Sequence, residues 1–134
     1  MSTDAATMNV GQQLVDLCNQ GRHLEAVETL YADDVVSVEA FEMPGHPKEL
    51  RGKEAVLGKS KWFFEANEVH GGEVKGPYPC ADGRFAAWMS MDITPREGPM
   101  AGKRLTMEEV CLYYVENGRI TREEFFYGGE DCSE

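Results

Sequence analysis

Three residues of types that transfer protons stand beside predicted strands or helices. Glu39 follows a β-branched run at 35–38, Glu123 lies in the last apolar segment, and His70 follows a predicted helix. A carboxyl group in apolar surroundings has a raised pKa and can act as an acid or a base near neutral pH. Two carboxyl groups in one cavity push their pKa values apart, which gives one acid and one base. Glu39, Glu123 and His70 are therefore the candidate catalytic residues.

Each of these residues also has an interpretation without chemistry. Glu39 could lie in water or pair with a lysine of the following helix. Glu123 stands in a run of charged residues at 122–124 that could pair across an exposed hairpin. His70 precedes two glycines and could be an ordinary residue at a helix end or in a loop.

The hydrophobic periodicity predicts an α+β domain that positions these residues. We expect helices at 8–20, 24–31 and 53–68, and strands at 35–39, 69–74, 84–94, 105–115 and 120–127. Turn residues predict loops at 42–52, 76–83 and 95–102. Residues 1–7 are predicted to be disordered, 8–128 to form a single domain, and 129–134 to be a polar tail.

The pair Asn117-Gly118 predicts a two-residue hairpin turn between the last two strands. Continuous pairing from this turn places 109, 111, 113, 115, 120, 122, 124 and 126 on one face, and their neighbours on the other. Both faces are largely apolar, so both should be covered. Helices would cover one face, and we expect a second copy of the chain on the outer face, as a homodimer. Alternatively, aromatics such as Tyr113 lie on the surface.

The composition limits the partners of the domain. A net charge of −11 repels phosphate backbones and anionic membranes, so we expect neither nucleic acid nor membrane as a partner. The chain has no run of 18 apolar residues and no secretory signal at its start, which predicts a cytoplasmic protein. The four cysteines are scattered and no glycine-rich phosphate loop is present, so we expect no metal and no cofactor.

Three segments together resemble the nuclear transport factor 2-like superfamily, and within it the SnoaL-like branch related to ketosteroid isomerase. They are LYADDVVSVE at 30–39, RGKEAV at 51–56 and VENGRITREEFFY at 115–127. The resemblance covers about residues 8 to 128. It implies a cone-shaped, curved antiparallel sheet wrapped by three N-terminal helices around a hydrophobic pocket. The fold hosts many functions, so it does not by itself imply one reaction.

The resemblance implies roles for particular positions. Glu39 occupies the place of the general base of ketosteroid isomerase. The isomerase's two oxyanion donors map to Leu14 or Val15 and to Val110, none of which can donate a side-chain hydrogen bond, so the steroid reaction does not carry over. An aspartate of limonene epoxide hydrolase maps near Phe125. The Asp and His of SnoaL-type cyclases could correspond only to Asp92, the glutamates and His70.

By the same mapping, the Val110 face of the last hairpin points into the cone, with Glu108, Glu123 and Tyr127 at the pocket. Core packing is the alternative for the aromatic residues. The candidate ligand-binding residues are Tyr31, Lys59, Trp62, Trp88, Asp92, Glu108, Phe125 and Tyr127.

These expectations predict a pocket protein for a small apolar molecule. One hypothesis is a cofactor-free isomerase, cyclase or hydrolase that uses carboxylate acid–base chemistry. The alternatives are a non-catalytic binding module for small apolar ligands and a protein-association domain.

Overall fold

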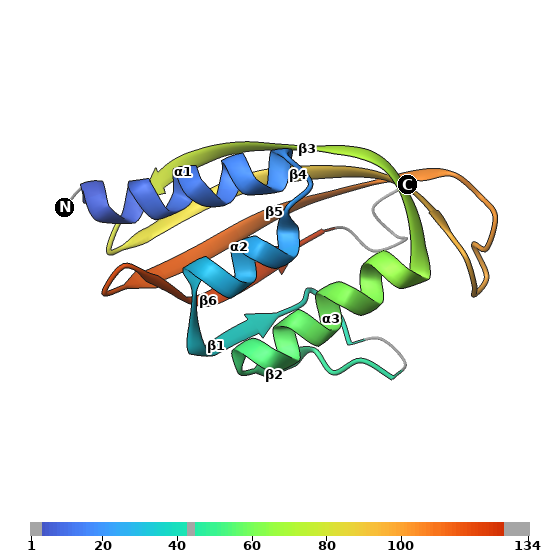
Figure 1. Cartoon of the computed structure of the whole chain (residues 1–134), viewed down its shortest axis with the longest axis horizontal. Coiled ribbons are helices and arrows are strands. Elements are labelled where there is room, and N and C mark those ends of the chain that lie inside the picture. Colours follow the sequence, from blue (N-terminus) through green and yellow to red (C-terminus); the bar gives the residue numbers. More distant parts are fainter. Residues whose placement is uncertain (1–3, 43–44, 128–134) are drawn as a thin grey trace.

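The computed structural model describes residues 4–42 and 45–127, and three helices in it lie over one face of a six-stranded curved sheet (Figure 1). This confirms the α+β fold. The helices and strands, in chain order, are α1 (Ala5–Asn19), α2 (His23–Leu30), β1 (Tyr31–Val38), β2 (Glu49–Arg51), α3 (Lys53–Ala66), β3 (Asn67–Cys80), β4 (Arg84–Pro95), β5 (Leu105–Glu116) and β6 (Arg119–Phe126).

The sheet is mixed rather than wholly antiparallel. Its strand order is β2-β1-β6-β5-β4-β3, and β1 pairs with β6 in the parallel direction. The parallel pair follows from the topology, because α3 and the long β3–β4–β5 meander separate the two strands in sequence. It places the end of β1, with Glu39 directly after it, beside the part of β6 that carries Glu123.

The first helix begins earlier than the sequence predicts. Asp4 is its N-cap, and the Asp4 side chain accepts a hydrogen bond of 2.7 Å from the backbone N–H of Thr7. Residues 5–7, which we expected to be disordered, therefore belong to α1, because this cap satisfies an otherwise free helical N–H. Residues 1–3 and the predicted tail at 129–134 lie outside the described residues. No helix among the described residues is long and apolar enough to cross a membrane.

The strand predicted at 69–74 is also longer than expected, because β3 continues to Cys80. Pro77 and Pro79 had indicated a turn there. They are tolerated because β3 is an edge strand, where a missing N–H does not break a ladder on both sides. The pairing with β4 shifts between Lys75 and Tyr78, which absorbs the irregular segment.

The last hairpin contains a register shift. Beyond it, the residues of β6 share a face with other residues of β5 than predicted. Val115 pairs with Ile120 as predicted, but Tyr114 then pairs with Arg122, so Thr121 is an extra residue on β6. Beyond this bulge the inward side chains are Glu123 and Phe125 on β6, opposite Tyr113 and Cys111 on β5. The inference that the Val110 face points into the cone is therefore wrong.

The inner face of the sheet packs on the helices and forms the core. Phe85, Cys111, Tyr113 and Ile120 are at most 1% exposed, and Phe85 stacks on Tyr113 with ring centroids 4.8 Å apart. The outer face carries apolar residues without a cover, among them Val110 at 48% and Phe126 at 52% exposed.

Helix α1 approaches the sheet most closely at Gly11. A Cβ atom at this position would lie 2.7 Å from Cβ of Pro77 and 3.1 Å from Cδ1 of Phe85. We expect Gly11→Ala to lower the free energy of unfolding by about 1–3 kcal/mol, because the helix must move off the sheet. Urea unfolding at neutral pH measures this change.

Gly58 in α3 is the matched control, because a Cβ atom at that position would have no atom within 4 Å of it. We expect Gly58→Ala to raise the free energy of unfolding by about 0.5–1 kcal/mol through helix propensity alone. If both substitutions raise stability equally, α1 does not pack on the sheet as described.

Candidate active site

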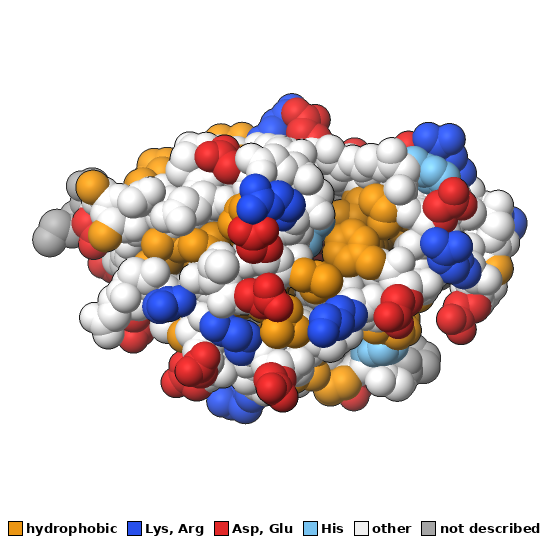
Figure 2. Space-filling view, in the orientation of Figure 1, with side chains coloured by type: hydrophobic (Ala, Val, Ile, Leu, Met, Phe, Trp, Pro, Cys, Tyr) orange, Lys and Arg blue, Asp and Glu red, His pale blue; other side chains and the backbone are white. Residues whose placement is uncertain are grey.

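A cavity of about 790 Å³ lies between the inner face of the sheet and the helices α2 and α3. Figure 2 shows hydrophobic side chains in the hollow between α2 and the far end of α3. The volume is in the range of pockets for small organic molecules. Most of the wall is apolar, with aromatic residues from α3 and methionines from β4 and β5: Trp62, Phe63, Phe64, Met89, Met91 and Met107.

One wall of the cavity is polar, and its groups form a continuous chain of hydrogen bonds. Lys59 of α3 donates to Oε2 of Glu39 at 2.6 Å and to Oγ of Ser37 at 2.8 Å. The Ser37 hydroxyl donates to Oε2 of Glu123 at 2.7 Å, and the hydroxyl of Tyr31 donates to the other oxygen of Glu123. Glu39 and Glu123 are thus linked through a lysine and a serine rather than by direct contact.

Glu123 is a core carboxylate. It is 2% exposed, and burial raises its pKa above the usual value of a glutamate. The positive charge of Lys59 and the hydrogen bonds from Tyr31 and Ser37 act in the opposite direction and stabilise the ionised form. The hydrogen bonds from Tyr31 and Ser37 join Glu123 of β6 to the neighbouring strand β1.

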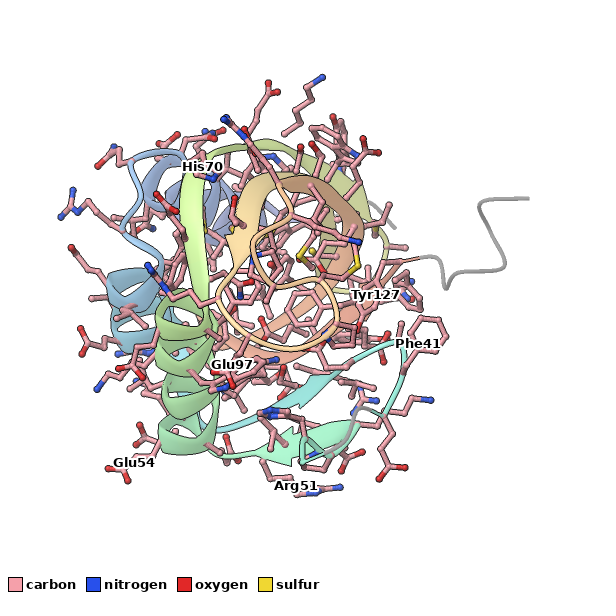
Figure 3. The ribbon with its side chains drawn as sticks, turned by 90° about the vertical axis from the view of Figure 1, so that its right-hand side faces the viewer. Phe41, Arg51, Glu54, His70, Glu97 and Tyr127 are labelled. Atoms are coloured by element: carbon pink, nitrogen blue, oxygen red, sulfur yellow. The ribbon has the colours of Figure 1, made fainter. Side chains whose placement is uncertain are left out.

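Glu39 is also paired, although it lies nearer the opening. Its side chain is 18% exposed, and besides the ion pair with Lys59 it accepts a hydrogen bond of 3.0 Å from the hydroxyl of Tyr127. The ring of Tyr127 in turn contacts Phe41, with centroids 5.5 Å apart. Figure 3 shows Phe41 and Tyr127 side by side at one edge of the molecule. Glu39 therefore both lines the cavity and pairs with a lysine, so the two interpretations do not exclude each other.

Glu109 of β5 is the carboxylate of this wall that has no partner. It lines the cavity, and no hydrogen bond or ion pair joins its side chain to any residue within the described parts of the chain. Burial raises its pKa to about 7, the charges of Glu39 and Glu123 add to the rise, and Lys59 opposes it. A carboxyl group with this pKa is present in both protonation states at neutral pH, which suits a general acid or base.

Seven of the predicted site residues meet at this cavity. Glu39, Glu123, Tyr31, Lys59, Phe125 and Tyr127 belong to its polar wall or lie beside it, and Lys59 sits over the ring of Phe125 at 4.9 Å. Trp62 lines the cavity from α3 but is 40% exposed, and its ring lies 4.2 Å from that of His46. Trp62 is therefore at the mouth rather than in the interior.

The other four predicted residues lie outside the cavity, three of them on the outer face of the sheet. Trp88 lies under the ammonium of Lys75 at 4.9 Å, Asp92 forms an ion pair of 2.7 Å with Arg104, and Glu108 is exposed. Side chains alternate along a strand, so these positions of β4 and β5 face away once their neighbours face inward. The prediction that they bind a ligand is not supported by this placement.

His70 is likewise outside the cavity. It lies on the edge strand β3, is exposed, and makes a hydrogen bond of 2.7 Å with the Thr94 hydroxyl. Figure 3 shows it well away from Tyr127. Because β3 begins at Asn67, directly after α3, His70 lies within a strand and not at a helix end or in a loop.

The sequence analysis missed Glu109, although one signal for it was present. Cys111 falls in an apolar pattern and is fully buried, and Glu109 is two residues away on the same strand, hence on the same face. The mapping of Val110 to the interior overrode that signal. Within the described residues, no group of three or more His, Cys, Asp or Glu side chains is arranged to hold a metal ion.

Comparisons with known proteins agree with this architecture. A family model for the SnoaL-like domain matches residues 5–127. The structure of a proposed SnoaL-like polyketide cyclase from Mesorhizobium loti, whose description adds carbohydrate phosphatase, is 43% identical with a TM-score of 0.80. The match covers 89% of this chain and 97% of that one. No match was found among curated proteins.

Two more distant structures share the fold. An NTF2-like protein of unknown function from Burkholderia pseudomallei is 16% identical with a TM-score of 0.74, and the match covers 96% of this chain and 95% of that one. An LEH-like epoxide hydrolase from Mycobacterium tuberculosis is 17% identical with a TM-score of 0.63, covering 92% and 79%. At this level of identity the likeness shows the fold alone.

The raised pKa of Glu109 predicts how the free energy of unfolding depends on pH. Its pKa is about 7 in the folded protein against a usual 4.5, so the folded state holds this proton to higher pH than the unfolded chain does. The free energy of unfolding should therefore fall as the pH rises from 4.5 to 7, by at most about 3 kcal/mol from this group. Glu109→Gln removes the ionisation, so the variant should be more stable than the wild type at pH 8 and equal to it near pH 4.

Urea unfolding of both proteins across this pH range checks the prediction, and the difference between them cancels the contributions of other groups. An equal difference at both ends of the range would show that Glu109 titrates normally.

Proposed function

The chain belongs to the SnoaL-like domain family, and we propose that it is a cofactor-free enzyme that transfers a proton on a small apolar substrate. The reaction would be of the isomerase or cyclase type. The observation that carries the proposal is the unpartnered carboxyl group of Glu109 in an apolar cavity, with its pKa raised to about 7. The family and the cyclase from M. loti support the same class of reaction.

In the proposed step, the ionised carboxylate of Glu109 removes a proton from a carbon atom next to a carbonyl group. The electron pair of the broken C–H bond forms the enolate, and the negative charge moves to the carbonyl oxygen. Where a C=C bond is conjugated with the enolate, Glu109 returns the proton to the far carbon of that bond, which completes an isomerisation. Alternatively, the enolate carbon attacks a second carbonyl group of the substrate, and Glu109 returns the proton to the alkoxide so formed, which closes a ring. The base is ready at neutral pH because burial has already raised its pKa.

The Glu39–Lys59 pair would act as a positioning group. Lys59 lies between the three carboxylates, and its charge lowers the pKa of both Glu109 and Glu123. Glu39 holds the Tyr127 hydroxyl at 3.0 Å on the same wall. An enolate oxygen near Tyr127 could take this hydrogen bond over from Glu39, in place of the donors absent at Leu14, Val15 and Val110.

A second candidate is a binding module without chemistry. The observation that favours it is that Lys59, Tyr31, Ser37 and Tyr127 all donate to protein carboxylates or to one another. A ligand carbonyl would have to displace one of these bonds to be activated. Three carboxylates on the wall disfavour a phosphate group, so the cavity does not suit the carbohydrate phosphatase activity named for the M. loti protein.

The base can be tested without knowledge of the natural substrate, by using 5-nitrobenzisoxazole. Removal of its C–H proton by a base breaks the N–O bond and releases a coloured cyanophenolate. We expect the protein to accelerate this elimination, with a rate that rises with pH through about 7 as Glu109 ionises. Glu109→Gln should lower the rate by about 100-fold or more, the usual contribution of a positioned base.

Glu108→Gln is the matched control, because the neighbouring carboxylate is exposed on the opposite face of the same strand. It should leave the rate unchanged. If Glu109→Gln catalyses the elimination as fast as the wild type does, Glu109 is not the base, and the binding module without chemistry is the better candidate.

We also propose that the outer face of the sheet binds a second copy of the chain. Lys75, Trp88, Val110 and Phe126 are partners in four successive strands and form one row across this face. The row has Lys75 at the β3 end, and the ion pair of Arg122 and Glu124 lies near the β6 end. A two-fold axis through its middle would cover the apolar centre, as an isologous interface requires.

Sedimentation equilibrium tests this interface. We expect the wild type to have twice the 15.0 kDa mass of one chain, and Val110→Glu to be monomeric, since the substitution buries two like charges at the axis. Phe41→Glu changes an equally exposed apolar residue at the cavity mouth and should remain dimeric. A monomeric wild type would refute the interface.

A further inference from the structure

The contacts of the Lys59 ammonium group are with protein groups. Two hydrogen bonds go to Glu39 and Ser37, at 2.6 and 2.8 Å, and the ring of Phe125 covers a third side, 4.9 Å from Nζ. An ammonium group has three N–H donors and no acceptor. Among the described residues that line the cavity, Lys59 is the only lysine or arginine. An anionic ligand would therefore find no free cation inside.

The carboxylates of the wall exceed this single positive charge. Glu39 uses its two oxygens for Lys59 and Tyr127, and Glu123 uses its two for Ser37 and Tyr31. Glu109 is the remaining one, and it is the carboxylate of this wall that has no hydrogen bond or ion pair within the described parts of the chain. It accepts a hydrogen bond when ionised and donates one when protonated.

The groups that face Glu109 set when it carries charge. They are Glu39 at the end of β1, Lys59 of α3, Glu123 of β6 and Tyr127 just after β6, with Cys111 and Tyr113 next along its own strand. Lys59 is the only positive charge in this set, and Glu39 already neutralises it. The field at Glu109 is therefore set by carboxylates, which repel a second anion in a medium of low dielectric constant.

The rest of the wall suits an uncharged lipophilic body. Methionines of β4 and β5 form the floor, together with Ile93 and Leu105, and the aromatic side chains of α3 close the opposite side. Methionine side chains adapt to the shape of a ligand and make favourable contacts with aromatic rings. Outside the polar wall, the described lining contains no Asp, Glu, Lys or Arg; its histidines are His23, whose pKa burial lowers, and His46.

We infer that the cavity selects uncharged lipophilic molecules that carry one hydrogen-bonding oxygen or nitrogen, and rejects carboxylates, sulfonates and phosphate esters. The inference rests on the proposed function in that it names the substrate class for the same site. Glu109 is the contact for the polar atom, and the methionine-lined region holds the apolar body. A carbonyl compound of this class would present its acidic C–H to the proposed base.

The test uses two fluorescent probes with the same ring system. N-phenyl-1-naphthylamine is uncharged, and 8-anilinonaphthalene-1-sulfonate differs from it by one sulfonate. N-phenyl-1-naphthylamine is titrated directly. The affinity of the sulfonate is measured by its displacement of N-phenyl-1-naphthylamine, so that only binding at the shared site is measured. At pH 8 we expect the sulfonate to bind at least about tenfold more weakly, because it meets ionised carboxylates in a cavity of low dielectric constant.

Two further measurements locate the effect. The discrimination should shrink as the pH falls below 7 in the wild type, and Glu109→Gln should reduce it at pH 8, where Glu108→Gln should not. Equal affinity for both probes, or tighter binding of the sulfonate, would overturn the inference. So would discrimination that is independent of both pH and Glu109.

The outcome is separable from the test of the proposed function. Selective binding of the uncharged probe without any elimination activity would keep the ligand class and remove the chemistry. Elimination activity without selectivity would keep the base and refute the ligand class.

Discussion

The arrangement of this site depends on a carboxylate that is buried in the core. An unpaired charge in the interior would be strongly destabilising, so Glu123 requires hydrogen-bond donors from the surrounding elements. Tyr31 at the start of β1, Ser37 near its end and Lys59 of α3 supply the donors and the countercharge. These partners bring β1, β6 and α3 to one point, and the same point is the polar wall of the cavity.

The network also determines which group is left for a ligand. Lys59 is shared between Ser37 and Glu39, and Glu39 in turn binds the hydroxyl of Tyr127, so these groups are paired with one another. Glu109 comes from β5, which contributes no other group to the network, and it enters the same apolar space without a donor. Two kinds of carboxylate thus lie on one wall: two that are paired with protein groups, and one that is not.

The register shift at Thr121 makes this arrangement possible. Without it, the inward side of β6 beyond Ile120 would present Arg122 and Glu124 to the core instead of Glu123 and Phe125. A single extra residue therefore places one charged side chain inside the domain and sends its two charged neighbours to the outer face. There Arg122 and Glu124 form an ion pair of 2.7 Å beside the exposed row that contains Val110 and Phe126.

The sequence by itself determined the fold class, the family and most of the helices and strands, because hydrophobic periodicity and turn residues are local signals. It also selected Glu39, Glu123, Lys59 and Tyr127, and the structure brings all four to one wall. Three features differed from the prediction. Helix α1 begins earlier because Asp4 caps it, and β3 is longer because an edge strand tolerates its prolines. His70 lies in that strand and away from the cavity. Which face of β5 points inward was decided only by the tertiary structure. The apolar pattern around Cys111 was the one signal in the sequence that separates Glu109 from the adjacent and chemically identical Glu108, and the extra residue on β6 hid it by changing which residues of the two strands share a face.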